Sequence, residues 1–305
     1  MKTAWRQWLY RAGVLIGAGL LAYQVWTTAA AVRQNLVQIA HPVWLGAAAG
    51  LILMATAVQI AAWIWVVRWL GVSLSAWRLM RGYILPFMAR YIPGSIWGYL
   101  GRSHWLEHHF SVPYSVSNLS SILEVASLLA SAGLVAAGYL ATVTRGAAQA
   151  GMLIVTVALV PSSWLMGQAL RRWPAAARWP ALDLLGAVTL RRWIGLLSLH
   201  LLFWLGYGAA IVLTVFSLGQ PLQGGWPAAT FAFATAWVAG FLFVFVPAGL
   251  GVREVSLVGL LMTQLGLGMP MATAVALAAR AYILIAELVY IIVGLAVTVR
   301  PSRAA

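Results

Sequence analysis

Long apolar segments alternate with short basic segments along most of the chain. An α-helix needs about 20 consecutive apolar residues to cross the hydrocarbon core of a bilayer. Apolar segments of that length predict six full membrane spans, over residues 12–32, 43–67, 113–141, 149–170, 191–217 and 270–299. The first span is also open to a second interpretation, as a signal peptide with a basic start and the small residues AAA near its end.

Two further apolar regions, 78–105 and 226–267, are broken by residues that interrupt helices. The first contains Pro86 and the sequence YIPGSIWGYLGR, and the second contains VPAGLGVRE. Proline removes a backbone donor and clashes with the preceding helical turn. Each region is therefore predicted to be a re-entrant hairpin or a pair of broken helices that enters and leaves the membrane on one side.

The two broken regions share an order of residues. Both read aromatic, β-branched and Pro, then small residues, then Gly and Arg, and an uninterrupted span follows each. Similar spacings separate Pro113 from Pro270 and Gly138 from Gly294. Because the predicted topology sends the two following spans in opposite directions, the units form an inverted repeat, a common device in transporters. Chance similarity between apolar segments is the alternative.

Composition agrees with a membrane protein. The chain is 63% hydrophobic and 8% charged, whereas soluble domains are about 25% charged. We predict an all-α polytopic membrane protein with about six full spans plus two re-entrant or broken-helix hairpins in an inverted repeat. A single transmembrane domain covers residues 1–305, with repeat units at 78–141 and 226–299.

The chain carries a net charge of +14, from 18 Arg, one Lys and five acidic residues. No basic soluble module is present to bind nucleic acid, and the basic residues lie between spans. Most fall on one side of the predicted topology, which the positive-inside rule identifies as cytoplasmic. We therefore expect a multi-pass protein of the cytoplasmic membrane with both termini in the cytoplasm, in contact with anionic lipids.

The broken regions are the candidate binding site. Non-helical backbone at membrane depth must be buried in protein or line a wet cavity, and helix N-termini at such breaks attract anions. The predicted hairpin backbone residues are Pro93, Gly94, Gly98, Gly101, Pro247, Gly249 and Gly251. The predicted contacts to lipid phosphate are Arg90, Arg102, Arg253 and Arg280. A simple kink, with the arginines reaching toward lipid head groups, is the structural alternative.

Acidic residues supply candidate partners. Glu124 and Glu287 lie within predicted spans, where ionisable groups usually face a cavity or a partner. Glu254 follows Arg253 directly and is able to neutralise it locally. The repeat offset places Arg280 at, or one residue from, the position equivalent to Glu124, which predicts an ion pair between these two side chains. Proton coupling and a purely structural role both remain open for these acids.

In the sequence HWLEHH, His104, Glu107 and His108 match H-x-x-E-H, a motif of zinc peptidases. Two histidines on one helical face are able to bind zinc, with the glutamate as base. No further ligand is evident in the sequence, and interfacial histidines near lipid phosphates are the alternative. We expect no cofactor and no metal.

The sequences YIPGSIWGYLGR, SILEVASLL and VPAGLGVREVSLVGLL resemble the lysylphosphatidylglycerol synthase transmembrane-domain family, also called flippase-like membrane proteins. The similarity covers most of the chain. It implies a lipid translocase, and the large soluble aminoacyl-transfer domain of the synthase members is not expected here. The family's Pro-Gly-Gly pattern is replaced by Pro247, Ala248 and Gly249.

Together these features predict a flippase or transporter of an anionic lipid: a polyprenyl phosphate, a polyprenyl-linked sugar or an anionic phospholipid. No catalytic residues are assigned. The alternative is a membrane enzyme or accessory protein that acts on lipid-linked sugars. Membrane lipids with anionic head groups are the expected partners, nucleic acid is not, and cell-envelope glycosyltransferases are a candidate partner class.

Overall fold

The computed structural model describes residues 23, 26–27, 40–87, 89, 97–173, 180–243, 249 and 251–296. Within that part every regular element is a helix, and six helices are long and apolar enough to cross a membrane. These six are α2 (Pro42–Trp69), α5 (Tyr114–Val143), α6 (Ala147–Arg172), α7 (Leu190–Ser217), α8 (Gly225–Leu242) and α10 (Met269–Ala296). The predicted all-α polytopic class is confirmed.

Five of these helices match predicted spans, and each begins close to the predicted start. The predicted span 12–32 lies outside the described residues apart from Tyr23, Trp26 and Thr27. The sixth long helix is α8, which belongs to the second broken region. One arm of that region is therefore longer than a short re-entrant helix, because its interruption comes only after Leu242.

The first broken region folds into two antiparallel helices, α3 (Ala76–Phe87) and α4 (Trp97–Phe110), here called hairpin 1. The arms approach closely: a Cβ atom on Gly82 would lie 2.7 Å from the ring of Trp105, and one on Gly101 would lie 3.2 Å from the carbonyl oxygen of Pro86. Glycine at these two positions therefore permits the contact. The predicted tip residues Pro93 and Gly94, together with Arg90, lie outside the described residues.

The second broken region folds in the same way, into α8 and α9 (Val252–Leu265), here called hairpin 2. A Cβ atom on Gly240 would lie 2.9 Å from the Cβ of Arg253, which places these residues side by side near the tip. Gly249 and Gly251 have φ angles of +69° and +80°, in the left-handed region that favours glycine. Pro247 lies outside the described residues.

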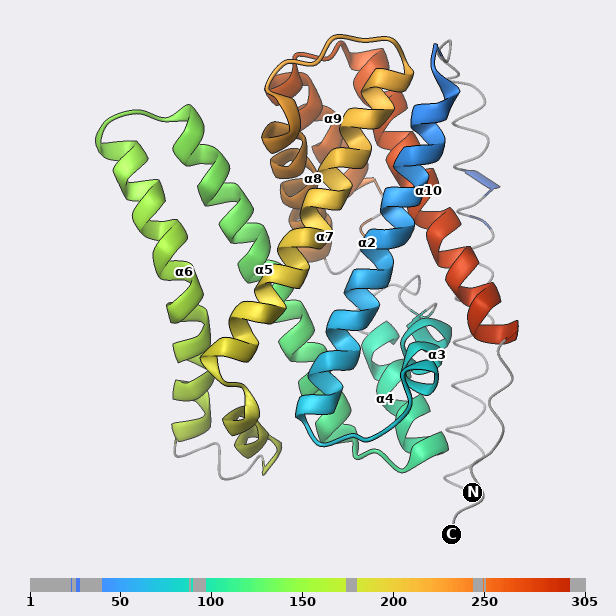
Figure 1. The fold of residues 1–305 in the computed structure, drawn as a ribbon, viewed down its shortest axis with the longest axis vertical. Coiled ribbons are helices and arrows are strands. Elements are labelled where there is room, and N and C mark those ends of the chain that lie inside the picture. Colours follow the sequence, from blue (N-terminus) through green and yellow to red (C-terminus); the bar gives the residue numbers. More distant parts are fainter. Residues whose placement is uncertain are drawn as a thin grey trace.

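The hairpins enter the bundle from opposite ends (Figure 1). Hairpin 1 lies at the lower end of the view and hairpin 2 at the upper end, and α5 and α10, which follow them, run in opposite directions. The second arms of the two hairpins, α4 and α9, have equal lengths. The offset along the chain from the start of α4 to the start of α9 equals the offset from the start of α5 to the start of α10. This arrangement is an inverted repeat.

The repeat also extends beyond the predicted units 78–141 and 226–299. A 28-residue helix precedes each hairpin, α2 in one case and α7 in the other. These helices pack antiparallel, since Gly195 of α7 lies against the ring of Trp65 and Gly206 lies against Ala55. Each half thus consists of a long helix, a hairpin and a second long helix. Helix α6 and the 3-10 helix η3 (Pro180–Ala187) connect the two halves.

Each hairpin contacts the final long helix of the other half. The ring of Tyr139 in α5 stacks on Phe231 of hairpin 2, and its hydroxyl donates to Gln264 at 2.9 Å. Gly294 of α10 lies against Leu85 of hairpin 1. The offset from Tyr139 to Gly294 is the same as the offset from the start of α5 to the start of α10. The two halves therefore contact each other through positions that correspond in the repeat.

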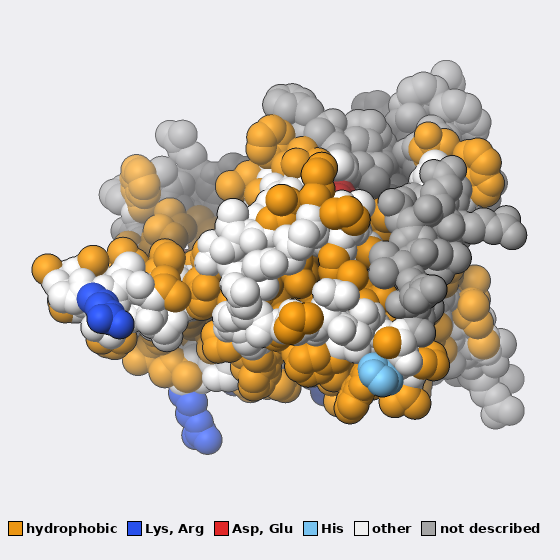
Figure 2. Space-filling view, turned by 90° about the horizontal axis from the view of Figure 1, so that it is seen from above, with side chains coloured by type: hydrophobic (Ala, Val, Ile, Leu, Met, Phe, Trp, Pro, Cys, Tyr) orange, Lys and Arg blue, Asp and Glu red, His pale blue; other side chains and the backbone are white. Residues whose placement is uncertain are grey.

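Basic side chains are concentrated at one end of the molecule. The end of α2, the start of α3, the end of α6 and the start of α7 share the lower end of Figure 1. They carry Arg68, Arg78, Arg81, Arg171, Arg172, Arg191 and Arg192. The α5–α6 link at the other end carries Arg145, and Figure 2, the view from that end, shows few Lys or Arg side chains among the described residues.

Candidate functional site

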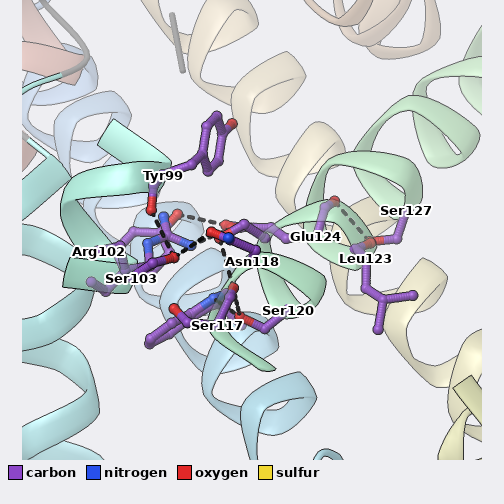
Figure 3. A network of polar contacts seen from close by, with 12 residues as sticks. Tyr99, Arg102, Ser103, Ser117, Asn118, Ser120, Leu123, Glu124 and Ser127 are labelled. Atoms are coloured by element: carbon purple, nitrogen blue, oxygen red, sulfur yellow. Dashed lines mark hydrogen bonds and ion pairs between the residues drawn. The ribbon is translucent and has the colours of Figure 1, made fainter. Parts of the chain in front are cut away.

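A buried ion pair joins hairpin 1 to α5. Nη1 of Arg102, in α4, lies 2.6 Å from Oε2 of Glu124, and the two side chains are 0% and 2% exposed. The hydroxyl of Tyr83, in α3, donates to the other carboxylate oxygen at 2.7 Å. Both oxygens of Glu124 are therefore held by hairpin 1, one by each arm. Figure 3 shows Arg102 and Glu124 pointing toward each other between the two helices.

Aromatic rings enclose the guanidinium of Arg102. Its central carbon lies 4.0 Å from the ring centroid of Tyr83, 4.7 Å from that of Trp63 and 5.5 Å from that of Tyr99. A guanidinium over an aromatic face is attracted by the ring quadrupole, more strongly where water is excluded. The positive charge thus has a carboxylate partner and aromatic walls, which is how a cation becomes tolerable at such depth.

A stripe of small polar residues runs along α5 on both sides of Glu124. Its members follow helical spacing and are buried: Ser117, Ser120, Ser121, Ser127 and Ser131. The indole N–H groups of Trp63 and Trp204 donate to Ser120 and Ser131, at 3.1 and 2.9 Å. Helices α2 and α7 are therefore tied to the same polar face of α5 that carries Glu124.

A second ion pair joins hairpin 2 to α10. Nε of Arg280 lies 3.6 Å from Oε1 of Glu254, and the two side chains are 5% and 22% exposed. The other carboxylate oxygen of Glu254 accepts from the backbone N–H of Gly251 at 2.7 Å, which caps the start of α9. Glu254 therefore serves both its own helix and the neighbouring long helix.

The predicted pair between Glu124 and Arg280 is wrong. Glu124 pairs with Arg102, and Arg280 pairs with Glu254. The physical reason is the path of the chain. The second arm of each hairpin runs antiparallel to the first and packs beside the long helix that follows. A partner from that arm reaches the deep charge without crossing the bundle to the other half.

The remaining predicted residues fall into different surroundings. Arg253 is half-buried, with its guanidinium 4.8 Å from the ring centroid of Phe233, in the other arm of hairpin 2. Glu287 is half-buried on α10, about two turns after Arg280. Gly98 is buried in the first turn of α4. The structure thus gathers Arg102 with Glu124 and Arg280 with Glu254, and the assigned role of each residue stays a prediction.

Three buried residues of interest were not predicted. Tyr83 and Trp63 hold or enclose the first ion pair, and no local spacing identifies them, because they reach it from other helices. His200 of α7 is 0% exposed, and within the described part of the chain neither ring nitrogen has a hydrogen-bond partner. A single histidine inside the apolar span 191–217 is the signal that could have pointed to it.

The H-x-x-E-H sequence lies at the end of α4. The rings of His104 and His108 stack with centroids 5.9 Å apart, and Nδ1 of His104 hydrogen bonds with the hydroxyl of Tyr114 at 2.8 Å. Among the described residues, no group of three or more His, Cys, Asp or Glu side chains is placed to hold a metal ion.

No protein-family model matches the chain, and comparison with curated proteins finds no significant relative. The resemblance to the flippase-like membrane proteins therefore stays a prediction, carried by the motifs alone.

Proposed function

We propose that this protein moves an anionic lipid across the cytoplasmic membrane. The observation that carries the proposal is Arg102, a fully buried cation between a broken hairpin and a long helix, whose partner is a carboxylate. Arginine suits bidentate recognition of carboxylate and phosphate alike, so a lipid phosphate is able to replace Glu124 there. Polyprenyl phosphate, a polyprenyl-linked sugar and an anionic phospholipid all carry the required group.

The fold supports transport. Inverted halves with interrupted helices are typical of secondary transporters, in which one half moves against the other around a central site. Each half of this chain supplies one hairpin, and each hairpin contacts the final helix of the other half. A change in one contact is thereby able to alter the other, as alternating access requires.

Charge distribution supports an orientation for the transporter. The lower end in Figure 1 carries most of the described basic residues, and the positive-inside rule favours that end as cytoplasmic. Helix α10 runs toward that end and finishes beside hairpin 1. Hairpin 1 would then open from the cytoplasmic leaflet and hairpin 2 from the outer leaflet, with both termini in the cytoplasm.

The burial of Glu124 disfavours the alternative of an enzyme acting on lipid-linked sugars. A sugar-transfer reaction needs acidic groups at an aqueous face, whereas Glu124 is 2% exposed and paired. Transport therefore accounts for its position more simply.

Reconstitution tests the proposal. Purified protein in vesicles should move fluorescent lipids with a phosphate head group between leaflets and should leave a neutral lipid of equal chain length in place. Arg102→Ala and Arg253→Ala should each abolish this movement, whereas Arg145→Ala, in the exposed α5–α6 link, should not. Unchanged transport in both Arg102→Ala and Arg253→Ala would reject the proposal.

A further inference from the structure

In each half of the repeat an ion pair joins the second arm of the hairpin to the long helix that follows, but the charges of the two pairs are reversed. In the first half the cation is on the hairpin, as Arg102 of α4, and the anion is on the long helix, as Glu124 of α5. In the second half the anion is on the hairpin, as Glu254 of α9, and the cation is on the long helix, as Arg280 of α10. Each half therefore contains a buried arginine that contacts a carboxylate.

The pairs also lie at matching depths from opposite ends of the molecule. Helix α5 starts at Tyr114 and carries Glu124, and α10 starts at Met269 and carries Arg280. At about 1.5 Å of rise per residue, each charge lies about 15–17 Å along its helix. Because α5 and α10 run in opposite directions, one arginine is nearer to each side of the bilayer.

The two ion pairs differ in contact distance and in the exposure of their side chains. The first has a 2.6 Å contact between side chains that are 0% and 2% exposed. The second has a 3.6 Å contact, and its carboxylate is 22% exposed. Moreover, Glu254 keeps a hydrogen bond to its own helix end when Arg280 changes partner, because its other oxygen accepts from Gly251. The second pair is therefore the one whose carboxylate is more easily replaced.

We propose that Arg280 is a second binding station for the phosphate group of a membrane lipid, at which the lipid competes with Glu254. Glu254 neutralises Arg280 when no lipid is bound, as Glu124 neutralises Arg102, so neither cation is left without a counter-ion in the membrane. In the state seen here the Arg280 station is ready for exchange and the Arg102 station is closed. The assignment of a lipid as ligand rests on the proposed function.

Two variants of the second pair should change lipid binding in opposite directions. Glu254→Gln removes the competing charge but keeps the cap, because glutamine also serves at this position of a capping box. It should bind phosphatidic acid about 1.5- to 5-fold more tightly, the factor that corresponds to a partly exposed ion pair. Arg280→Gln should bind it about tenfold or more weakly, because a charge-assisted contact is lost.

The experiment measures retention of phosphatidic acid by the full chain in lipid nanodiscs, using native mass spectrometry. Glu107→Gln and Arg145→Gln, at exposed positions, are the matched controls and should bind as the parent does. If Arg280→Gln fails to fold, Arg280→Lys replaces it; it retains the charge but not the bidentate fork, and should also bind more weakly. Inorganic phosphate at equal concentration should not displace the lipid.

Opposite shifts in the two variants would support the station. Unchanged binding in both Glu254→Gln and Arg280→Gln, or weaker binding in both, would show that the ion pair is only structural. Either result would overturn the proposal that Arg280 binds lipid phosphate. Displacement by inorganic phosphate would overturn the assignment of a lipid. Transport measured on the same preparations separates the two proposals: the predicted binding pattern without transport rejects only the proposed function, and transport with unaltered binding rejects only the station.

Discussion

Each charge of the buried pair between Arg102 and Glu124 should be costly to remove on its own. At the observed 2.6 Å, the attraction between Arg102 and Glu124 is about 6 kcal/mol at an effective dielectric constant of about 20, and desolvation of the two groups offsets much of it. Breaking a buried pair from one side nevertheless costs about 3–5 kcal/mol, because the remaining charge stays buried without a partner. We expect this loss for Arg102→Met and for Glu124→Gln.

The double variant should lose much less than the sum of the two single losses, since no charge then remains unpaired. A coupling energy of about 2–3 kcal/mol is expected, toward the upper end of the range for contacting residues. The assay is unfolding of the purified protein in mixed micelles, followed by circular dichroism, with exposed Glu107→Gln as control. If each single variant lowers the free energy of unfolding by less than about 1 kcal/mol, and the two losses add in the double variant, the pair does not hold hairpin 1 against α5.

Three further substitutions probe the contacts around the hairpins. Gly240→Ala should destabilise by about 1–3 kcal/mol in the same assay, because the new methyl group meets Arg253 at 2.9 Å; Gly138→Ala, which meets nothing within 4 Å, should instead stabilise by about 0.5–1 kcal/mol. Tyr83→Phe removes a hydrogen bond to a carboxylate and should cost about 1.5–3 kcal/mol by thermal unfolding. His200→Phe removes a buried polar ring without a described partner and should leave stability unchanged or raise it; a loss above about 1 kcal/mol would reveal a bound water or other partner.

The long helices could be predicted from sequence because a run of apolar residues is a local signal with a length set by the bilayer. Helices α2, α5, α6, α7 and α10 begin close to their predicted starts for this reason. The interruption of both broken regions was predictable in the same way, from proline and glycine. The length of α8 was not, because VPAGLGVRE marks where that helix has ended but not how far it runs before that point.

The full extent of the repeat was missed for a different reason. Helices α2 and α7 are both predominantly apolar and share no motif, so nothing in the sequence pairs them. Their equivalence emerges only from direction and packing: each precedes a hairpin, and they cross antiparallel at Gly195 and Gly206.

Ion-pair partners were the least predictable feature of the candidate site. Spacing along a helix limits which residues of that helix can meet, but it says nothing about a neighbouring arm. Arg102 and Glu124 belong to different helices and meet because α4 lies beside α5. The depth of Glu124 and Arg280 was visible in the sequence, and so was their need for partners. The identity of those partners depended on the return path of each hairpin.

We propose that the protein carries lipids by their phosphate groups, and transfer between leaflets tests this directly. The most direct measurement places purified protein in vesicles with a fluorescent phosphate lipid in both leaflets and adds a membrane-impermeant reductant that bleaches the outer leaflet. Bleaching should proceed beyond the outer-leaflet fraction with the parent protein and should stop at that fraction with Arg102→Ala, which changes the buried pair. Bleaching that stops at the outer leaflet with the parent protein, or that proceeds equally for a neutral lipid, would contradict the proposal.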